Sequence, residues 1–137
     1  MWFRLLRRDR RAVAVMEFAL VLPALTLLLL GIFGYGQYFL LAHSAQQMAN
    51  DAARATIAGL SPAERTALAH ASVARAITKL PTMKAGQVAV AVKEDAGLVT
   101  VQVRLDTAAN EFMRLAVVPM PDPVIERRGV VRQGGVE

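Results

Sequence analysis

One acid stands apart from the other titratable groups of this sequence. Glu17 lies just inside the start of a nearly continuous apolar run, and no charged side chain follows it from Phe18 to Ala42. A carboxylate inside a membrane helix is costly, so such a residue usually faces a partner and carries function. A plainer interpretation also stands: Glu17 stays among the lipid headgroups, where the positive end of the helix dipole favours an anion.

The spacing before Glu17 suggests what that partner is. If the chain is cut between Ala12 and Val13, Glu17 becomes the fifth residue of the new chain. The new α-amino group and the carboxylate could then pair, within one chain or between neighbouring chains. Pairing would remove two charges that are unfavourable in lipid, and it would favour one axial register during assembly.

No other group of residues predicts chemistry. His43 and His70 are far apart and have no acid cluster beside them, while Glu94 and Asp95 fall in a predicted turn. The sequence has no phosphate-binding loop, no dinucleotide glycine pattern, no HExxH motif and no serine in a nucleophile-elbow context. It also has no cysteine, which excludes disulfides and thiolate metal sites. We therefore predict a protein that is not an enzyme and has no cofactor or metal.

The element that must position Glu17 is a membrane helix. The apolar run from Ala12 to Ala42 exceeds the roughly 20 residues that a helix needs to cross about 30 Å of hydrocarbon. A helix also satisfies all of its own backbone polar groups in lipid. The run is preceded by five arginines: Arg4, Arg7, Arg8, Arg10 and Arg11.

Those arginines account for most of the formal charge of +5, because they face only Asp9 in the first 12 residues. The basicity therefore flanks a membrane segment and does not indicate a nucleic-acid partner. The positive-inside rule predicts a cytoplasmic N-terminus, with the rest of the chain on the other side of the membrane. The run is too long for an ordinary cleaved signal peptide, but an uncleaved signal anchor stays open.

At this point the residues resemble a family. The stretch RRAVAVMEFALVLPALTLLLLGIFGYGQ is similar to the start of TadE-like pseudopilins, which are minor pilins of the tight-adherence branch of type IV pilus machinery. The shared features are a basic leader, a small residue, four residues, Glu-Phe and an early Leu-Pro. Here these are Arg10-Arg11, Ala12 (usually glycine in the family), Val13 to Met16, Glu17-Phe18 and Leu22-Pro23.

The resemblance implies cleavage after Ala12 by a prepilin peptidase in the bacterial inner membrane, with Glu17 and Phe18 as the assembly residues. It implies other pilin and pseudopilin subunits and a pilus assembly platform as partners, besides the lipid bilayer. A weaker likeness at the C-terminal end, in Gly129 to Arg132, fits a terminal strand followed by a basic residue.

Pro23 predicts a kink or local opening of the helix near residues 19–23, which is tolerated in a membrane helix and need not be a functional hinge. Beyond Ala42 the helical pattern continues to residue 58 without membrane hydrophobicity, and Gly59 is a plausible stop. The small apolar residues of this extension recur at helical spacing. They are Ala45, Met48, Ala49, Ala52 and Thr56.

A second helix is predicted within residues 60–84. Ser61, Pro62 and Glu64 form a strong start signal, and Pro81 ends the helix. The predicted apolar side is Ala67, Leu68, Ala71, Ala74, Ile77 and Leu80.

Strands follow the second helix. Two period-two valine runs, at 88–93 and 99–106, predict a hairpin with Gly97 at a positive φ, and residues 124–131 predict a third strand. Residues 110–117 are expected to form a short helical turn or connection.

These elements predict an α+β, lollipop-shaped single-pass protein. We expect a basic leader over 1–12, a transmembrane helix over 13–42, a helical extension over 43–59 and a small domain outside the cytoplasm over 60–137. The predicted function is that of a minor pilin-like subunit needed to assemble a pilus. The alternative is an uncleaved membrane-anchored adaptor whose small domain binds an envelope partner.

Overall fold

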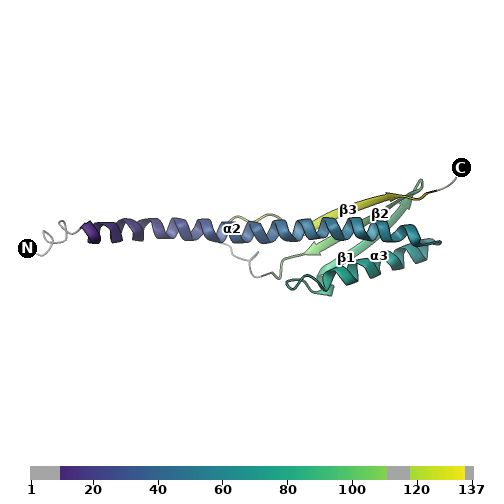
Figure 1. Cartoon of the computed structure of the whole chain (residues 1–137), viewed down its shortest axis with the longest axis horizontal. Coiled ribbons are helices and arrows are strands. Elements are labelled where there is room, and N and C mark those ends of the chain that lie inside the picture. Colours follow the sequence, from purple (N-terminus) through teal and green to yellow (C-terminus); the bar gives the residue numbers. More distant parts are fainter. Residues whose placement is uncertain (1–9, 111–117, 135–137) are drawn as a thin grey trace, which may run out of the picture.

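The computed structural model describes residues 10–110 and 118–134. It has an α+β architecture in which a long helix, α2 (Arg10–Ala55), extends from one end of a small domain. The domain contains α3 (Pro62–Ile77) and the strands β1 (Val88–Asp95), β2 (Leu98–Asp106) and β3 (Val124–Arg132), with short 3-10 turns at Thr56–Ala58 and Ala85–Gln87. Figure 1 shows the sheet and α3 lying along the C-terminal half of α2, which gives the predicted lollipop shape.

The three strands form one antiparallel sheet in the order β1-β2-β3. The β1–β2 hairpin is closed by Ala96 (φ 46°) and Gly97 (φ 75°). Two successive residues at positive φ are what a tight two-residue hairpin turn requires, because its twist matches that of the strands. The predicted positive φ at Gly97 is confirmed, and Ala96 shares it.

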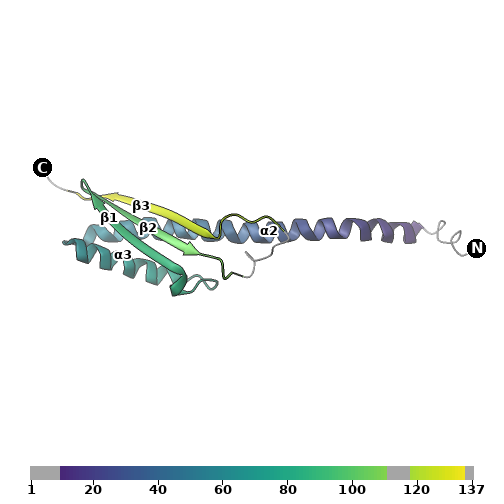
Figure 2. The ribbon, with the colours of Figure 1, turned by 180° about the vertical axis from the view of Figure 1, so that it is seen from behind.

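The core lies between one face of the sheet and the two helices. Strand β2 buries Val101, Val103 and Leu105 completely, and β3 buries Ile125, which is only 1% exposed. Figure 2, from behind, shows the sheet in front of α2 with α3 alongside. The alternating valines thus bury one face, as their period-two pattern predicts.

The extension of α2 supplies the other side of this core. The residues predicted from helical spacing are all buried: Ala45, Met48, Ala49, Ala52 and Thr56. Small side chains bring the helix axis close to the sheet, and Thr56 satisfies its buried hydroxyl by donating to the Ala53 carbonyl at 2.6 Å. The domain therefore begins to pack on α2 long before the α2–α3 turn.

The predicted apolar side of α3 was partly wrong. Ala67, Ala71 and Ala74 are exposed, whereas Ala69 and Val73 are buried. Alanine occurs all round this helix, so its spacing does not fix which side faces inward. The larger apolar side chains do, because they gain more from burial: Val73 is buried, and Leu68 and Ile77 are half-buried.

The start of α3 is as predicted, because the Ser61 side chain accepts a hydrogen bond from the Glu64 amide at 3.2 Å. The C-terminal ends of the two helices differ slightly from expectation. α3 ends at Ile77, before Leu80. Gly59 follows the 3-10 turn but has φ −84°, so it is not a left-handed cap. A Cβ there would meet the backbone nitrogen of Arg65 at 2.9 Å, so the glycine permits close packing. The connection predicted at 110–117 lies, after its first residue, outside the described residues.

Candidate membrane-spanning and assembly segment

The N-terminal half of α2 touches little of the domain. In the described part of the chain α2, with the turn after it, is the one helix long and apolar enough to cross a membrane, and its most apolar 18-residue window has mean hydropathy 2.4 and is 0% buried. Gly34 is the first buried residue of α2. This apolar surface fits a single-pass membrane protein.

The residues of the proposed cut lie within this helix. Ala12, Val13 and Glu17 all belong to α2, so Val13 and Glu17 lie one turn apart on the same side of the helix. The Glu17 side chain is exposed, and within the described residues it makes no hydrogen bond or salt bridge. The fold of the described domain therefore does not require this acid.

The other predicted site residues are also exposed along α2. Phe18 is 59% exposed, and Arg10 and Arg11 stand in the first turn. Arg4, Arg7 and Arg8 lie outside the described residues. α2 passes through Pro23 as one element, helical on both sides, so the predicted kink stays a prediction.

One contact that the sequence did not signal joins α2 to the sheet. Gly129 of β3 is buried against the backbone of α2, where an added Cβ would meet the Ala49 carbonyl group and lie 2.8 Å from the Asn50 nitrogen. Beside it, the Gln46 amide donates to the Arg128 carbonyl at 2.9 Å. In the sequence, Gly129 is a small residue among the larger side chains of a predicted strand. A glycine in such a place often marks a close approach of two backbones.

An ion pair joins α3 to the sheet. The Arg65 guanidinium donates from Nε and from Nη2 to the two carboxylate oxygens of Glu94, each at 2.8 Å. The hydrogen bonds from Arg65 lower the pKa of Glu94, and they raise the pKa of Arg65. The pair ties the domain together at the end away from the apolar segment.

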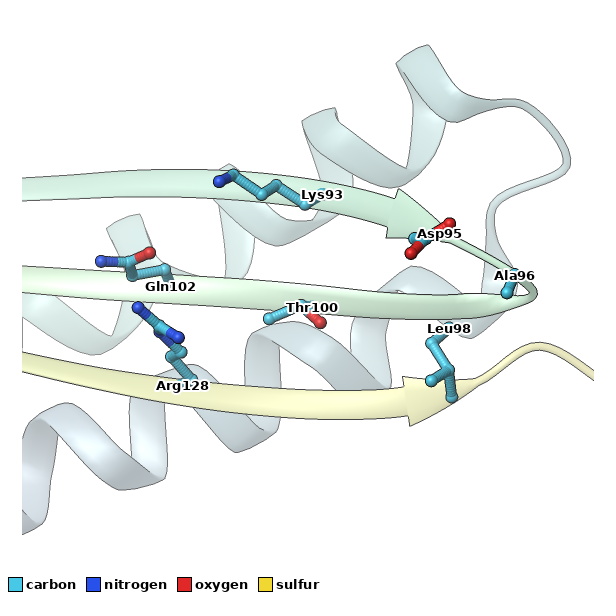
Figure 3. A pocket seen from close by; sticks show the side chains of 7 residues that line it. All are labelled: Lys93, Asp95, Ala96, Leu98, Thr100, Gln102 and Arg128. Atoms are coloured by element: carbon cyan, nitrogen blue, oxygen red, sulfur yellow. The ribbon is translucent and has the colours of Figure 1, made fainter.

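The outer face of the sheet carries a shallow concavity near the β1–β2 turn. Figure 3 shows Lys93, Thr100, Gln102 and Arg128 projecting from this face, across all three strands. Asp95 is the one acid among its lining residues. These groups include no nucleophile with a base beside it, and among the described residues no cluster of His, Cys, Asp or Glu could hold a metal ion.

Comparison with known protein families gives a match for α2 only. Residues 12–54 match the TadE-like protein family. The resemblance stated from the sequence is thus confirmed over the stretch that begins at the proposed cut and ends in the last turn of α2. Comparisons with curated proteins and with solved structures gave no match.

The TadE-like match points to a protein related to the tight-adherence pilus, and the matched family is one of structural pilus components. It covers the exposed apolar half of α2 and the extension that packs against Gly129, and it leaves out α3 and the sheet. The match thus spans both the apolar segment that could cross a membrane and the extension that packs in the core of the domain.

Proposed function

We propose that this chain is a minor pilin-like subunit that is processed after Ala12 and is needed to assemble a tight-adherence pilus. The observation that carries the proposal is the position of Glu17. It is an exposed acid, it has no partner within the described residues, and it lies one turn after Val13 inside the TadE-like stretch.

Cleavage after Ala12 would give Glu17 a partner of opposite charge, the new α-amino group of Val13. The new ammonium group and the carboxylate carry opposite charges and would lie within one helical turn or on adjacent chains. In a low-dielectric medium their attraction is much stronger than in water, so they would neutralise each other there. A neighbouring subunit positioned by this pairing would dock in one register.

The remaining parts of the chain have roles that follow from this. The arginines that precede Ala12 hold the leader in the cytoplasm, and the domain stands on the periplasmic side of the inner membrane. The partners are a prepilin peptidase first, then other pilin subunits and the assembly platform.

The mass of the mature protein tests the processing step. The full chain is expressed with an active prepilin peptidase or with a catalytically inactive one, extracted from membranes and measured intact. We expect a chain that starts at Val13 only when the peptidase is active. A start at Met1 or Met16 with the active peptidase would contradict the proposal, and a permanent Met1 would favour the membrane-anchored adaptor.

Substitution of Glu17 tests the assembly step. Glu17→Gln keeps the size of the side chain and removes its charge, so we expect normal membrane insertion and a strong loss of pili counted by electron microscopy. Asp51→Asn is the matched control, because Asp51 is an exposed acid on the same helix but outside the apolar segment. Normal piliation of Glu17→Gln would reject the role of charge pairing.

A further inference from the structure

Two residues of the connection that leads into β3, Val118 and Pro119, contact α2. The Tyr35 hydroxyl donates to the Pro119 carbonyl at 2.8 Å. A Cβ built on Gly31 would lie 3.8 Å from Cγ1 of Val118, so this valine rests against the glycine. Val118 and Pro119 therefore lie beside α2 at the level of Gly31 to Tyr35, and Met120 and Pro121 follow them in the chain.

That level is set by the length of the apolar segment. From Val13 to Phe33 α2 is mostly exposed, and these 20 steps at about 1.5 Å each give about 30 Å, the thickness of the hydrocarbon core. Burial begins at Gly34. A bilayer entered at Val13 thus ends beside Val118 and Pro119.

The other placement moves the connection deeper. If Glu17 stays among the headgroups, the span starts at Phe18. A span of the same length then ends near Tyr38, about five residues beyond the end of the first placement at Phe33. Val118 and Pro119 would then lie several ångströms inside the hydrocarbon boundary. Both placements bring this part of the connection to the bilayer on the side of the domain.

The composition of the connection suits that position. Val118, Pro119, Met120 and Pro121 carry no charge, and the two prolines have no backbone N–H that lipid would leave unpaired. The Pro119 carbonyl is satisfied by Tyr35, a residue type that favours the membrane interface. The first charged side chain afterwards is Asp122, whose carboxylate accepts from the Val124 amide at 2.8 Å.

We propose that Val118–Pro121 is a membrane-contacting segment that enters the headgroup–acyl boundary of the phospholipid leaflet on the side of the domain. The domain then sits directly on the bilayer, held by two points: α2 through the membrane and this segment beside it. The inference depends on the membrane span alone and not on processing or pilus assembly.

Fluorescence in vesicles tests the proposal. The chain has no cysteine, so a single cysteine introduced as Met120→Cys can carry an environment-sensitive NBD label. The full chain is reconstituted in phosphatidylcholine–phosphatidylglycerol vesicles, with or without lipids that carry a nitroxide high on the acyl chain. We expect a blue-shifted emission from position 120 and quenching by the nitroxide lipid.

Two matched sites frame the result. Ala63→Cys, exposed at the start of α3, should emit as in water and stay unquenched, and Leu27→Cys should be shielded within the span. Water-like emission at position 120 would overturn the proposal, and so would shielding without quenching, which would mean that protein covers the segment. If Leu27→Cys is unshielded, the span itself fails and the proposal with it. Far-UV circular dichroism checks that each variant is folded.

Discussion

At the scale of single residues, the Arg65–Glu94 pair shows how one ion pair depends on pH. Both side chains are partly exposed, at 12% and 27%, so solvent screens the pair and its contribution is modest. The geometry is nevertheless bidentate, which is the strongest arrangement for an arginine and a carboxylate. Its effect on stability therefore has a defined sign.

Glu94 has a pKa that is lower in the folded chain than the usual value, because Arg65 donates hydrogen bonds to it. The stabilisation that the ion pair gives the folded chain is present above the unfolded-state pKa of Glu94, about 4.3. It is lost as the pH falls through the lower pKa that Glu94 has in the folded chain. We expect Glu94→Gln to lower the melting temperature at pH 7, with the difference shrinking below pH 4. Thermal circular dichroism in detergent at both pH values measures this.

The control for that experiment is Glu126→Gln. Glu126 lies 3.6 Å from Arg104, and both side chains are about half exposed, at 42% and 55%. Little change is expected at either pH. A melting-temperature difference for Glu94→Gln that persists unchanged at low pH would show that the ion pair is not its source.

At the scale of elements, the packing of α2 on β3 decides how the membrane helix is fixed to the domain. The contact uses alanines on the helix and Gly129 on the strand, so two backbones approach closely. Such a contact leaves no room for a larger side chain. It makes α2 a rigid continuation of the domain into the apolar segment.

Gly129→Ala should therefore destabilise the chain by about 1–3 kcal/mol, because the new methyl group must displace the Ala49 carbonyl or the strand. Gly86→Ala is the control, since nothing lies within 4 Å of a Cβ there. Urea denaturation of the full chain in detergent measures both. Equal stability of the two variants would contradict the close approach.

At the scale of the whole molecule, the two halves of α2 suit two different surroundings, a lipid bilayer and the core of the domain. Its 46 residues span about 70 Å at about 1.5 Å per residue, roughly twice the hydrocarbon thickness. The N-terminal half presents apolar side chains outward, and the C-terminal half turns its small residues toward the sheet. The chain should therefore insert through the first half alone.

Leu25→Lys places a charge near the centre of the exposed apolar segment and should disfavour insertion by about 3 kcal/mol. Leu60→Lys is the control, because Leu60 is 94% exposed in the α2–α3 turn. The fraction of each variant that resists alkaline extraction from membranes gives the comparison. Equal retention of both would mean that the apolar half of α2 does not span the bilayer.

The sequence by itself determined the elements whose patterns have one solution. A long uncharged apolar run has to be a helix in lipid, period-two valines have to form strands, and the motif around Glu17 and Phe18 indicated the TadE-like family before any fold was known. The start of α3 was equally clear, because Ser61 and Pro62 satisfy the free amides of a helix start in a local way.

The tertiary structure decided what local patterns leave open. The inward side of α3 was ambiguous because alanines surround it, and only packing in the core selected Ala69 and Val73. The roles of Gly129 and Tyr35 depend on partners about 80 residues away in the chain, Ala49 and Pro119. Such contacts arise from long-range packing, which no short stretch of sequence encodes, and they fix where the domain stands relative to the apolar segment.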